Sequence, residues 1–524
     1  MVRLMDTLSS KFSAIVKSVL SGFDRIVFKG MLMPIVHAAG MQYYLSSRGV
    51  LNKDFKNYAM KQSQAIVQSA EELAKDQYGG TIEFIKSLNE RKETLAHNRQ
   101  QERGVKEGLI GIWSCVESCN TFKSTFDPSK NYPALRYERS RCKHLYFYFD
   151  DPVYGFMSVR LQTWAPYEIQ IAMNGREWLR RSLDARGCGY ILNGNKFMHI
   201  DDYALAQELL NNQKKADFEE ILTGFLPSVF PQMKTVVGDM SYYWTVWQSE
   251  VAKDYIFESG DALKPLMKDF LLHSLITGTG ERILRYFGSP VKANGQPHPR
   301  SNPEILSRAN TWYDGLRVRH WNGSNSVKLY NEHNVLRLEM TMNDPTKFKI
   351  HRHTEGQEKS EPKKLMPMRK GIADMTTRAN VSLSIVERFA EHMATVEEKT
   401  PLGKLLDSIA RPIIEKGKRH RALDMFGKDM ELLKAVADPV FDVEHITNKD
   451  LQKKLISSPW AKKMTGKQLS GRVSRHLALL REHGLIKKLP RQRRYVLTGK
   501  GRTITTALSV TLAASVNDLL NLAA

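Results

Sequence analysis

Apolar residues recur along this chain with two periods, one typical of strands and one typical of helices. Residues 23–30 alternate between apolar and polar side chains, which predicts a strand. Residues 109–116 form a continuous apolar run, which predicts a buried strand, and residues 135–171 are rich in aromatic and β-branched types. Further along the chain, four short apolar segments predict a β-meander at 316–321, 327–330, 335–342 and 348–351.

Helical periods fill most of the remaining chain. The predicted helices cover about 7–20, 34–48, 52–77, 82–103, 176–186, 201–214, 217–225, 241–258, 261–286 and 369–397. Within 241–258, Tyr243, Trp247 and Val251 recur every four residues, which predicts the apolar face of a helix. No internal sequence repeat is apparent.

The C-terminal segment 446–502 has the pattern of a winged helix-turn-helix. Its second helix has one apolar face, formed by Leu469, Val473, Leu477 and Leu480. Gly484 follows this helix, and glycine readily adopts the left-handed conformation that ends a helix. Residues 486–489 and 494–497 then predict the two strands of a basic wing.

Segment 289–302 is rich in Pro, Gly, Asn and Ser and predicts a linker. We therefore expect a multidomain α+β protein. Its first predicted parts are an N-terminal α+β body at 1–287 and a linker at 288–311. A β-meander with a long helix follows at 312–398, and a helical segment with the winged helix at 399–524.

Composition favours a globular protein that binds a polyanion. The chain is 42% hydrophobic and 26% charged, with a formal net charge of +22. It contains four cysteines, which is sparse for a disulfide scaffold and fits a reducing compartment. The first residues lack the pattern of a secretory signal, and no apolar run is long enough to span a membrane. We expect a cytoplasmic protein without a membrane partner.

Positive charge is concentrated in the predicted winged helix. Between Lys449 and Arg502, sixteen lysines and arginines face two acidic residues. The candidate nucleic-acid contacts are Lys467, Ser470, Arg472, Ser474, Arg475, Lys487, Lys488, Arg491, Arg493 and Arg494. The segment resembles the MarR-like winged helices of bacterial regulators, which implies binding of duplex DNA. Charge alone does not distinguish RNA from DNA as the ligand. A winged helix can also bind protein. The sequence does not decide the oligomeric state, and a dimer is one option.

A second constellation lies on two strands of the predicted meander. Lys328 and Tyr330 share one face of their strand, and Arg337 and Glu339 share one face of the next. The pattern resembles the Lys-x-Tyr and Arg-x-Glu strand pair of rolling-circle replication initiators. That resemblance implies a nucleophilic hydroxyl at Tyr330 and a metal-binding carboxylate at Glu339. The alternative is a half-polar sheet face that carries a cross-strand ion pair.

Carboxylates at predicted strand ends give a third candidate site. Asp24 lies on the first predicted strand and Glu117 follows a later one, beside further acids in the chain. A nuclease or transposase core of the ribonuclease H type binds Mg²⁺ through such acids from separate strands. If the protein is an enzyme, we expect a Mg²⁺-dependent nuclease or nickase with Asp24, Glu117, Tyr330 and Glu339 as its catalytic residues.

Four soft ligands also lie close together in the sequence. Cys115 and Cys119 are separated by three residues, and Cys142 and His144 by one. Two such pairs are what a structural Zn²⁺ site needs, although buried free thiols are the alternative.

Several motifs together, among them FDRIVFKG, CKHLYFYF, NGREWL and RRYVLTGKGR, resemble a widespread family of bacterial proteins of similar length with a C-terminal winged helix. The leading hypothesis is a nucleic-acid-binding protein, either a regulator or a partner of a structured RNA. The alternative is a mobile-element enzyme that processes DNA.

Overall fold

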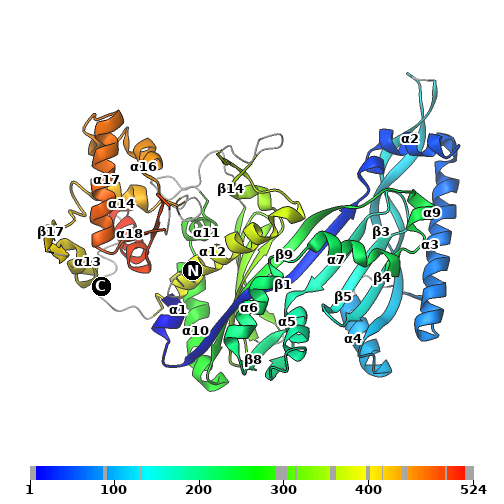
Figure 1. Cartoon of the computed structure of the whole chain (residues 1–524), viewed down its shortest axis with the longest axis horizontal. Helices are drawn as coiled ribbons and strands as arrows, with labels where there is room; N and C mark the ends of the chain where they lie inside the picture. Colours follow the sequence, from blue (N-terminus) through cyan, green and yellow to red (C-terminus); the bar gives the residue numbers. More distant parts are fainter. Residues whose placement is uncertain are drawn as a thin grey trace.

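The protein is an α+β protein built around one large sheet. The computed structural model describes residues 7–86, 91–129, 131–289, 304–312, 315–353, 362–396, 402–415, 417–438, 441, 445–489 and 492–513. Within these residues, eleven strands form a mixed sheet in the order β10-β11-β12-β13-β9-β1-β6-β5-β4-β3-β2, and four small hairpins lie outside it. Figure 1 shows the long strands β1 (Val16–Met31) and β9 (Tyr243–Phe257) crossing the middle of the molecule.

The sheet consists of two halves with the same connectivity. In each half a long strand is followed by helices and then by a four-stranded antiparallel meander, whose last strand returns to pair with the long strand. The first half is β1 with β3 (Gly108–Asp127), β4 (Tyr132–Asp151), β5 (Gly155–Gln162) and β6 (Ile169–Asn174). The second half is β9 with β10 (Ile305–Trp312), β11 (Gly315–Asn322), β12 (Asn325–Glu332) and β13 (Val335–Met342).

Strands β1 and β9 pair with each other in the antiparallel direction and join the two halves. The short strand β2 (Glu83–Phe84) adds to the outer edge of the first half. A single sheet therefore runs through residues on both sides of the predicted linker, most of which lies outside the described residues. This repeat of topology left no recognisable repeat in the sequence.

One face of the sheet is apolar and holds the main core. In the first half it buries Phe23 and Phe147 beneath α2 (Ala38–Ser47) and α3 (Phe55–Tyr78). In the second half the core includes Leu338 and Met340 of β13 together with α10 (Gly260–Thr277), α11 (Gly280–Tyr286) and α12 (Met375–Met393). Because side chains alternate along a strand, the residues between these apolar positions point to the opposite, polar face.

The polar face is partly covered by smaller elements. Helix α4 (Lys92–Arg103) packs on β3, and helices α5 (Gly175–Asp184) and α6 (Tyr203–Gln213) pack on β1. Close packing of α5 depends on Gly175, where a Cβ would come within 2.3 Å of the Phe23 carbonyl oxygen. The hairpin of β7 (Tyr190–Asn193) and β8 (Lys196–Ile200) follows α5 and leads into α6.

Two predictions of helix were wrong, and the predicted helix 82–103 is confirmed only from Lys92 onward, because Glu83 and Phe84 form strand β2. Residues 241–258 form strand β9, which pairs with β1 and β13. The predicted apolar face is also wrong, because Tyr243 and Trp247 are more than half exposed whereas Val251 is buried in the core. Residues 7–20 form only the short helix α1 (Thr7–Lys11) before β1 begins at Val16.

Three of the four predicted meander strands are confirmed as β11, β12 and β13. The fourth forms β14 (Lys349–Arg352), which pairs with β15 (Lys364–Pro367) outside the large sheet. Strand β10, which opens the meander, lies largely in the segment predicted as a linker.

The C-terminal unit has a core of its own and lies at one end of the molecule (Figure 1). It contains α14 (Met430–Val436), α16 (Asn448–Leu455), α17 (Gly466–Glu482), the hairpin of β18 (Ile486–Lys488) and β19 (Tyr495–Leu497), and α18 (Gly499–Ala513). The predicted apolar face of α17 is buried, and Gly484 has the expected positive φ of 71°. None of the helices described is long and apolar enough to cross a membrane.

Candidate active site on the polar sheet face

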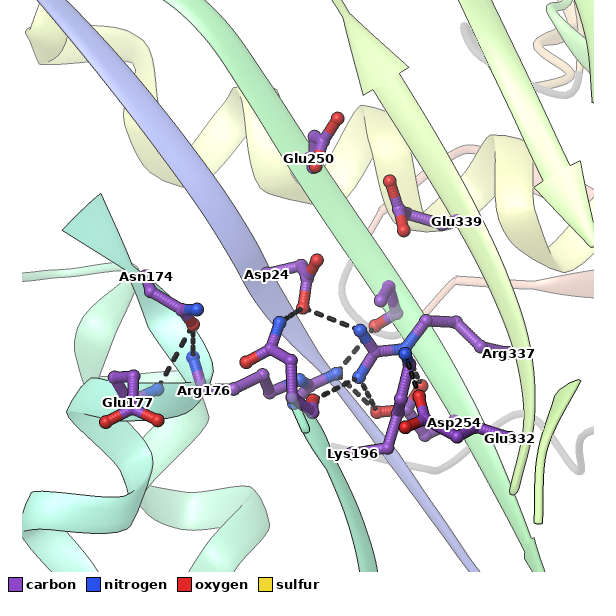
Figure 2. A network of polar contacts seen from close by, with 12 residues as sticks. Asp24, Asn174, Arg176, Glu177, Lys196, Glu250, Asp254, Glu332, Arg337 and Glu339 are labelled. Carbon is purple, nitrogen blue, oxygen red and sulfur yellow. Dashed lines mark hydrogen bonds and ion pairs between the residues drawn. The ribbon is translucent and has the colours of Figure 1, made fainter. Parts of the chain in front are cut away.

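Three carboxylates from three neighbouring strands meet on the polar face of the sheet. Asp24 comes from β1, Glu250 from β9 and Glu339 from β13, and one oxygen of each lies within 4.8 Å of the others. The β1–β9 register shifts between Phe23 and Arg25, so Asp24 lies at a β-bulge. Figure 2 shows the three side chains directed toward one another above the sheet.

The neighbouring strand β12 supplies a lysine and a tyrosine to the same cluster. The Tyr330 hydroxyl donates a hydrogen bond to Oε2 of Glu339, with a distance of 2.9 Å. The Lys328 ammonium forms an ion pair with Glu339 and lies 3.4 Å from Oε1 of Glu250. The register places Lys328 opposite Glu339 and Tyr330 opposite Arg337, so the predicted shared faces are confirmed.

A buried guanidinium connects the cluster to a second group of charges. Arg337 Nη1 donates to Oδ1 of Asp24 at 2.7 Å, and its Nε and Nη2 donate to the two oxygens of Asp254 at 2.6 and 2.8 Å. Asp254 also accepts an ion pair from Arg176 at 2.9 Å, while Asn195 donates to Asp24 at 2.6 Å. This network, drawn in Figure 2, holds Asp24 in place against the bulge.

Electrostatics distinguish Glu250 from the other acids. Burial and the negative charge of Glu339 raise the pKa of Glu250 to about 7. Burial also disfavours the charged form of Glu339, but Lys328 and Arg337 lower its pKa below the usual value. Glu339 is therefore the ionised acceptor of the Tyr330 hydrogen bond, and Glu250 carries a charge that its neighbours do not fully balance.

The oxygen donors of this cluster suit a hard divalent cation. Among the contacts of the described residues, Oδ2 of Asp24 and Oε2 of Glu250 have no hydrogen-bond partner. Carboxylate oxygens from separate strands are the ligands that Mg²⁺ prefers. Asp24 and Glu250 can therefore bind a divalent cation, with Glu339 beside them. The cation would replace the proton that Glu250 otherwise takes up.

Three of the four predicted catalytic residues come together, although they lie far apart in the sequence. Asp24, Tyr330 and Glu339 lie in the cluster. Lys328 and Glu339 also form a cross-strand ion pair, which is the alternative predicted for these strands in place of a catalytic site. The sequence prediction missed Glu250, because its strand was predicted to be a helix. The many aromatic and β-branched residues around Glu250 were the available signal for a strand.

Glu117 does not join this cluster, which corrects its predicted catalytic grouping. It accepts hydrogen bonds from the Tyr146 hydroxyl at 2.7 Å, from Lys92 at 3.0 Å and from Arg160 Nε at 3.1 Å. Burial opposes ionisation of Glu117, but the bonds from Tyr146 and Lys92 lower its pKa to about 2. Glu117 is an ionised carboxylate with hydrogen-bond donors on both oxygens, in the first half of the sheet.

The predicted zinc ligands do not form a metal site. Cys119 and Cys142 are joined by a disulfide, and Cys115 is a buried free thiol, whose pKa burial raises to about 12. His144 lies between the Cys142 carbonyl oxygen at 3.1 Å and Arg160 at 3.0 Å, so both ring nitrogens are occupied. Among the described residues, the only group of three or more potential ligands is Asp24, Glu250 and Glu339.

Most of the predicted nucleic-acid contacts lie on the surface of the C-terminal unit. Lys467, Ser474, Arg475, Lys488 and Arg493 are exposed. Ser470, Lys487 and Arg494 are half-buried, whereas Arg491 lies outside the described residues.

Two helix positions make contacts within the C-terminal unit. The half-buried Arg472 lies over the ring of Trp460, 4.4 Å from its centroid, and is therefore turned toward the protein. Asn448 at the start of α16 donates to the Ser474 hydroxyl at 2.7 Å and to the Ser470 carbonyl oxygen at 2.9 Å. These bonds fix the angle between α16 and α17.

Comparison of the chain with protein-family models, with curated protein sequences and with solved structures gives no match.

Proposed function

We propose that the C-terminal unit is a winged helix-turn-helix that binds duplex DNA. The observation that carries this proposal is the division of α17 into a buried leucine-rich face and an exposed basic face with Lys467 and Arg475. Two backbone hydrogen bonds between Ile446 and Tyr495, at 2.7 and 2.9 Å, form a single-residue bridge to the hairpin β18–β19. A helix pair followed by such a small sheet presents its second helix to a major groove.

Charge reversal in the wing tests this proposal. The double variant Arg493→Glu and Arg494→Glu should weaken binding to duplexes of every sequence alike, because a wing contacts mainly phosphate. Wild-type binding should fall on the order of 10³-fold or more between about 50 and 200 mM salt, and the variant should show a shallower dependence. The matched control is Arg411→Glu, because Arg411 is exposed and lies outside both α17 and the hairpin β18–β19. Unchanged affinity in a gel-shift titration of the double variant contradicts the proposal.

A second candidate function is cleavage of a DNA strand at the carboxylate cluster. The observation that favours it is the meeting of Tyr330, Glu339 and Asp24 with Glu250 on one sheet face. A hydroxyl hydrogen-bonded to an ionised carboxylate, beside a lysine and unpaired carboxylate oxygens, has the parts of a nucleophilic phosphodiester transfer. The resemblance of this strand pair to rolling-circle initiators supports the same assignment.

In this reaction the Tyr330 hydroxyl passes its proton to Glu339 as its oxygen attacks the phosphorus of a phosphodiester. The bond from phosphorus to the 3′ oxygen breaks, and that oxygen takes a proton from Lys328. The products are a 5′-phosphotyrosine ester and a free 3′-hydroxyl. Burial and the charge of Glu339 raise the pKa of Tyr330 well above its usual value. Asp24 and Glu250 would hold a divalent cation, whose positive charge would favour the phenolate form of Tyr330 and the developing charge on phosphate. Arg337 keeps Asp24 in position throughout.

Incubation with supercoiled plasmid and Mg²⁺ or Mn²⁺ tests the cleavage function. The wild type should convert plasmid to nicked circles and leave a protein–DNA adduct that survives denaturation. Tyr330→Phe should abolish both products, whereas Tyr190→Phe, which removes a hydroxyl hydrogen-bonded to Asp184 outside the cluster, should retain them. Nicking by Tyr330→Phe at the wild-type rate excludes Tyr330 as the nucleophile, and absence of nicking by the wild type excludes the activity on this substrate.

A further inference from the structure

A cavity of about 320 Å³ lies on the polar sheet face, next to the carboxylate cluster. Strands β1, β4, β5 and β6 form its floor, and the beginning of α4 forms one wall. Arg25 links the cavity to the cluster, since it lines the cavity and is the direct cross-strand partner of Glu250. Any group in the cavity is therefore close to a ligand bound between Asp24 and Glu250.

The lining of this cavity has an excess of positive charge. It contains four basic side chains and one acidic side chain, Arg25, Arg91, Lys92, Arg160 and Glu93. Glu117, behind Lys92 and Arg160, offsets one further charge, which leaves the surroundings cationic. Glu93 forms an ion pair with Arg25, whose side chain is 41% exposed and thus accessible to an incoming anion.

The rest of the lining suits a flat, polar group. Tyr146 provides aromatic surface beside Lys92, while Gln170 and Ser158 provide an amide and a hydroxyl. Val27 and Ala172 form an apolar floor. A volume near the lower end of the roughly 300–1,000 Å³ range of ligand sites fits one nucleotide and excludes a duplex.

We propose that this cavity binds a single nucleotide of a nucleic-acid strand, with its phosphate at Arg25 and Arg91 and its base against Tyr146 and Gln170. This inference rests on the proposed strand cleavage, for which it would position the nucleotide beside the reacting phosphate. Aromatic surface combined with arginine is the usual means of binding unpaired bases. The cavity also requires that the strand be unpaired at this point, so the cleaved DNA is single-stranded or locally melted.

Binding can be measured separately from cleavage, by titrating the full-length protein in EDTA with a fluorescent single-stranded hexanucleotide and with free mononucleotides. Ala172→Phe fills the floor of the cavity, and the double variant Arg25→Gln with Arg91→Gln removes its accessible charge. We expect both variants to lose roughly tenfold or more in hexanucleotide affinity. Arg411→Gln, an exposed arginine in an ion pair of its own, should bind as the wild type does.

The outcomes separate this proposal from the cleavage function. Loss of binding in Ala172→Phe and in the arginine double variant, at an unchanged melting temperature, supports the cavity, whatever the result of the plasmid assay. Tyr330→Phe should bind the hexanucleotide normally, even though cleavage is lost. Saturable binding of free mononucleotides that the same variants abolish, without any binding of the hexanucleotide, assigns the cavity to a small-molecule nucleotide and overturns the strand assignment. Wild-type affinity in Ala172→Phe and in the arginine double variant overturns the proposal altogether.

Discussion

Two clusters on the polar face of the sheet are built from the same residue types but have different electrostatic character. In the first half, Glu117 is surrounded by Lys92, Tyr146 and Arg160, and its pKa is lowered to about 2. In the second half, Glu339 contacts Lys328 and Tyr330 in a similar way. The second cluster differs because further acids are buried beside it.

The balance of charge explains the difference. Among the described contacts, the second cluster brings together four acids and three bases, namely Asp24, Glu250, Asp254, Glu339, Arg176, Lys328 and Arg337. Burial and the charge of Glu339 raise the pKa of Glu250 even though Lys328 and Arg25 lower it, whereas the bonds from Tyr146 and Lys92 lower the pKa of Glu117. A lysine–tyrosine–glutamate group on paired strands is therefore structural when its carboxylate is ionised and fully paired, and a candidate for cation binding and catalysis when a second buried acid lies beside it.

The largest effect should come from removing the central arginine of each cluster. Arg337→Met leaves Asp24 and Asp254 buried without their main partner, which should cost on the order of 3–5 kcal/mol of unfolding free energy. Arg160→Met should cost only about 1–2 kcal/mol, because Glu117 keeps Lys92 and Tyr146. Urea denaturation of both variants measures the difference, and equal losses would show that the clusters are equivalent.

The pH dependence of stability should have opposite signs in the two clusters. The pKa of Glu250 is raised to about 7, so its contribution to stability is present below about pH 4.5 and is lost as the pH rises through 7. The pKa of Glu117 is lowered to about 2, so its contribution is present above about pH 4.5 and is lost as the pH falls toward 2.

Glutamine variants isolate these two contributions. Relative to the wild type, Glu250→Gln should gain about 2–3 kcal/mol at pH 8 and little at pH 5. Glu117→Gln should lose stability at both pH values. Urea denaturation across this range gives the slopes, and a Glu250→Gln curve parallel to that of the wild type would contradict the raised pKa.

A smaller effect should come from divalent cations. Mg²⁺ at ten times its dissociation constant should stabilise the wild type by about 1.4 kcal/mol. Glu250→Gln should remove this gain and Glu117→Gln should retain it, because only the first change alters the set of oxygen ligands. Thermal melting with and without Mg²⁺ measures both variants. An equal Mg²⁺ response in both variants places the cation elsewhere.

The sequence predicted much of the second cluster because its parts lie on a short, regular meander. Alternation between apolar and polar residues determined the strands, and pairing through a tight turn then placed Lys328 opposite Glu339. The apolar face of α17 was predictable for a similar reason, since a helix period is a local property.

The missing acid could not be placed by the same logic. In β9 most residues from Val251 to Phe257 are buried on both faces, so the polar–apolar alternation that identifies a strand is absent. The bulge at Asp24 and the pairing of β1 with β9 also depend on contacts between residues more than two hundred positions apart. Local patterns contain no information on such pairings, so Glu250 could not be assigned to the site.

The central position of β1 has a consequence for synthesis of the chain on the ribosome. One side of β1 can pair with β6 as soon as residue 174 has emerged, but its other side waits for β9, which ends at Phe257. During that interval the nascent first half presents a long open edge that can pair with other chains. We expect shortened chains that end before β9 to aggregate, and the growing chain to require protection by chaperones until the second half closes the sheet.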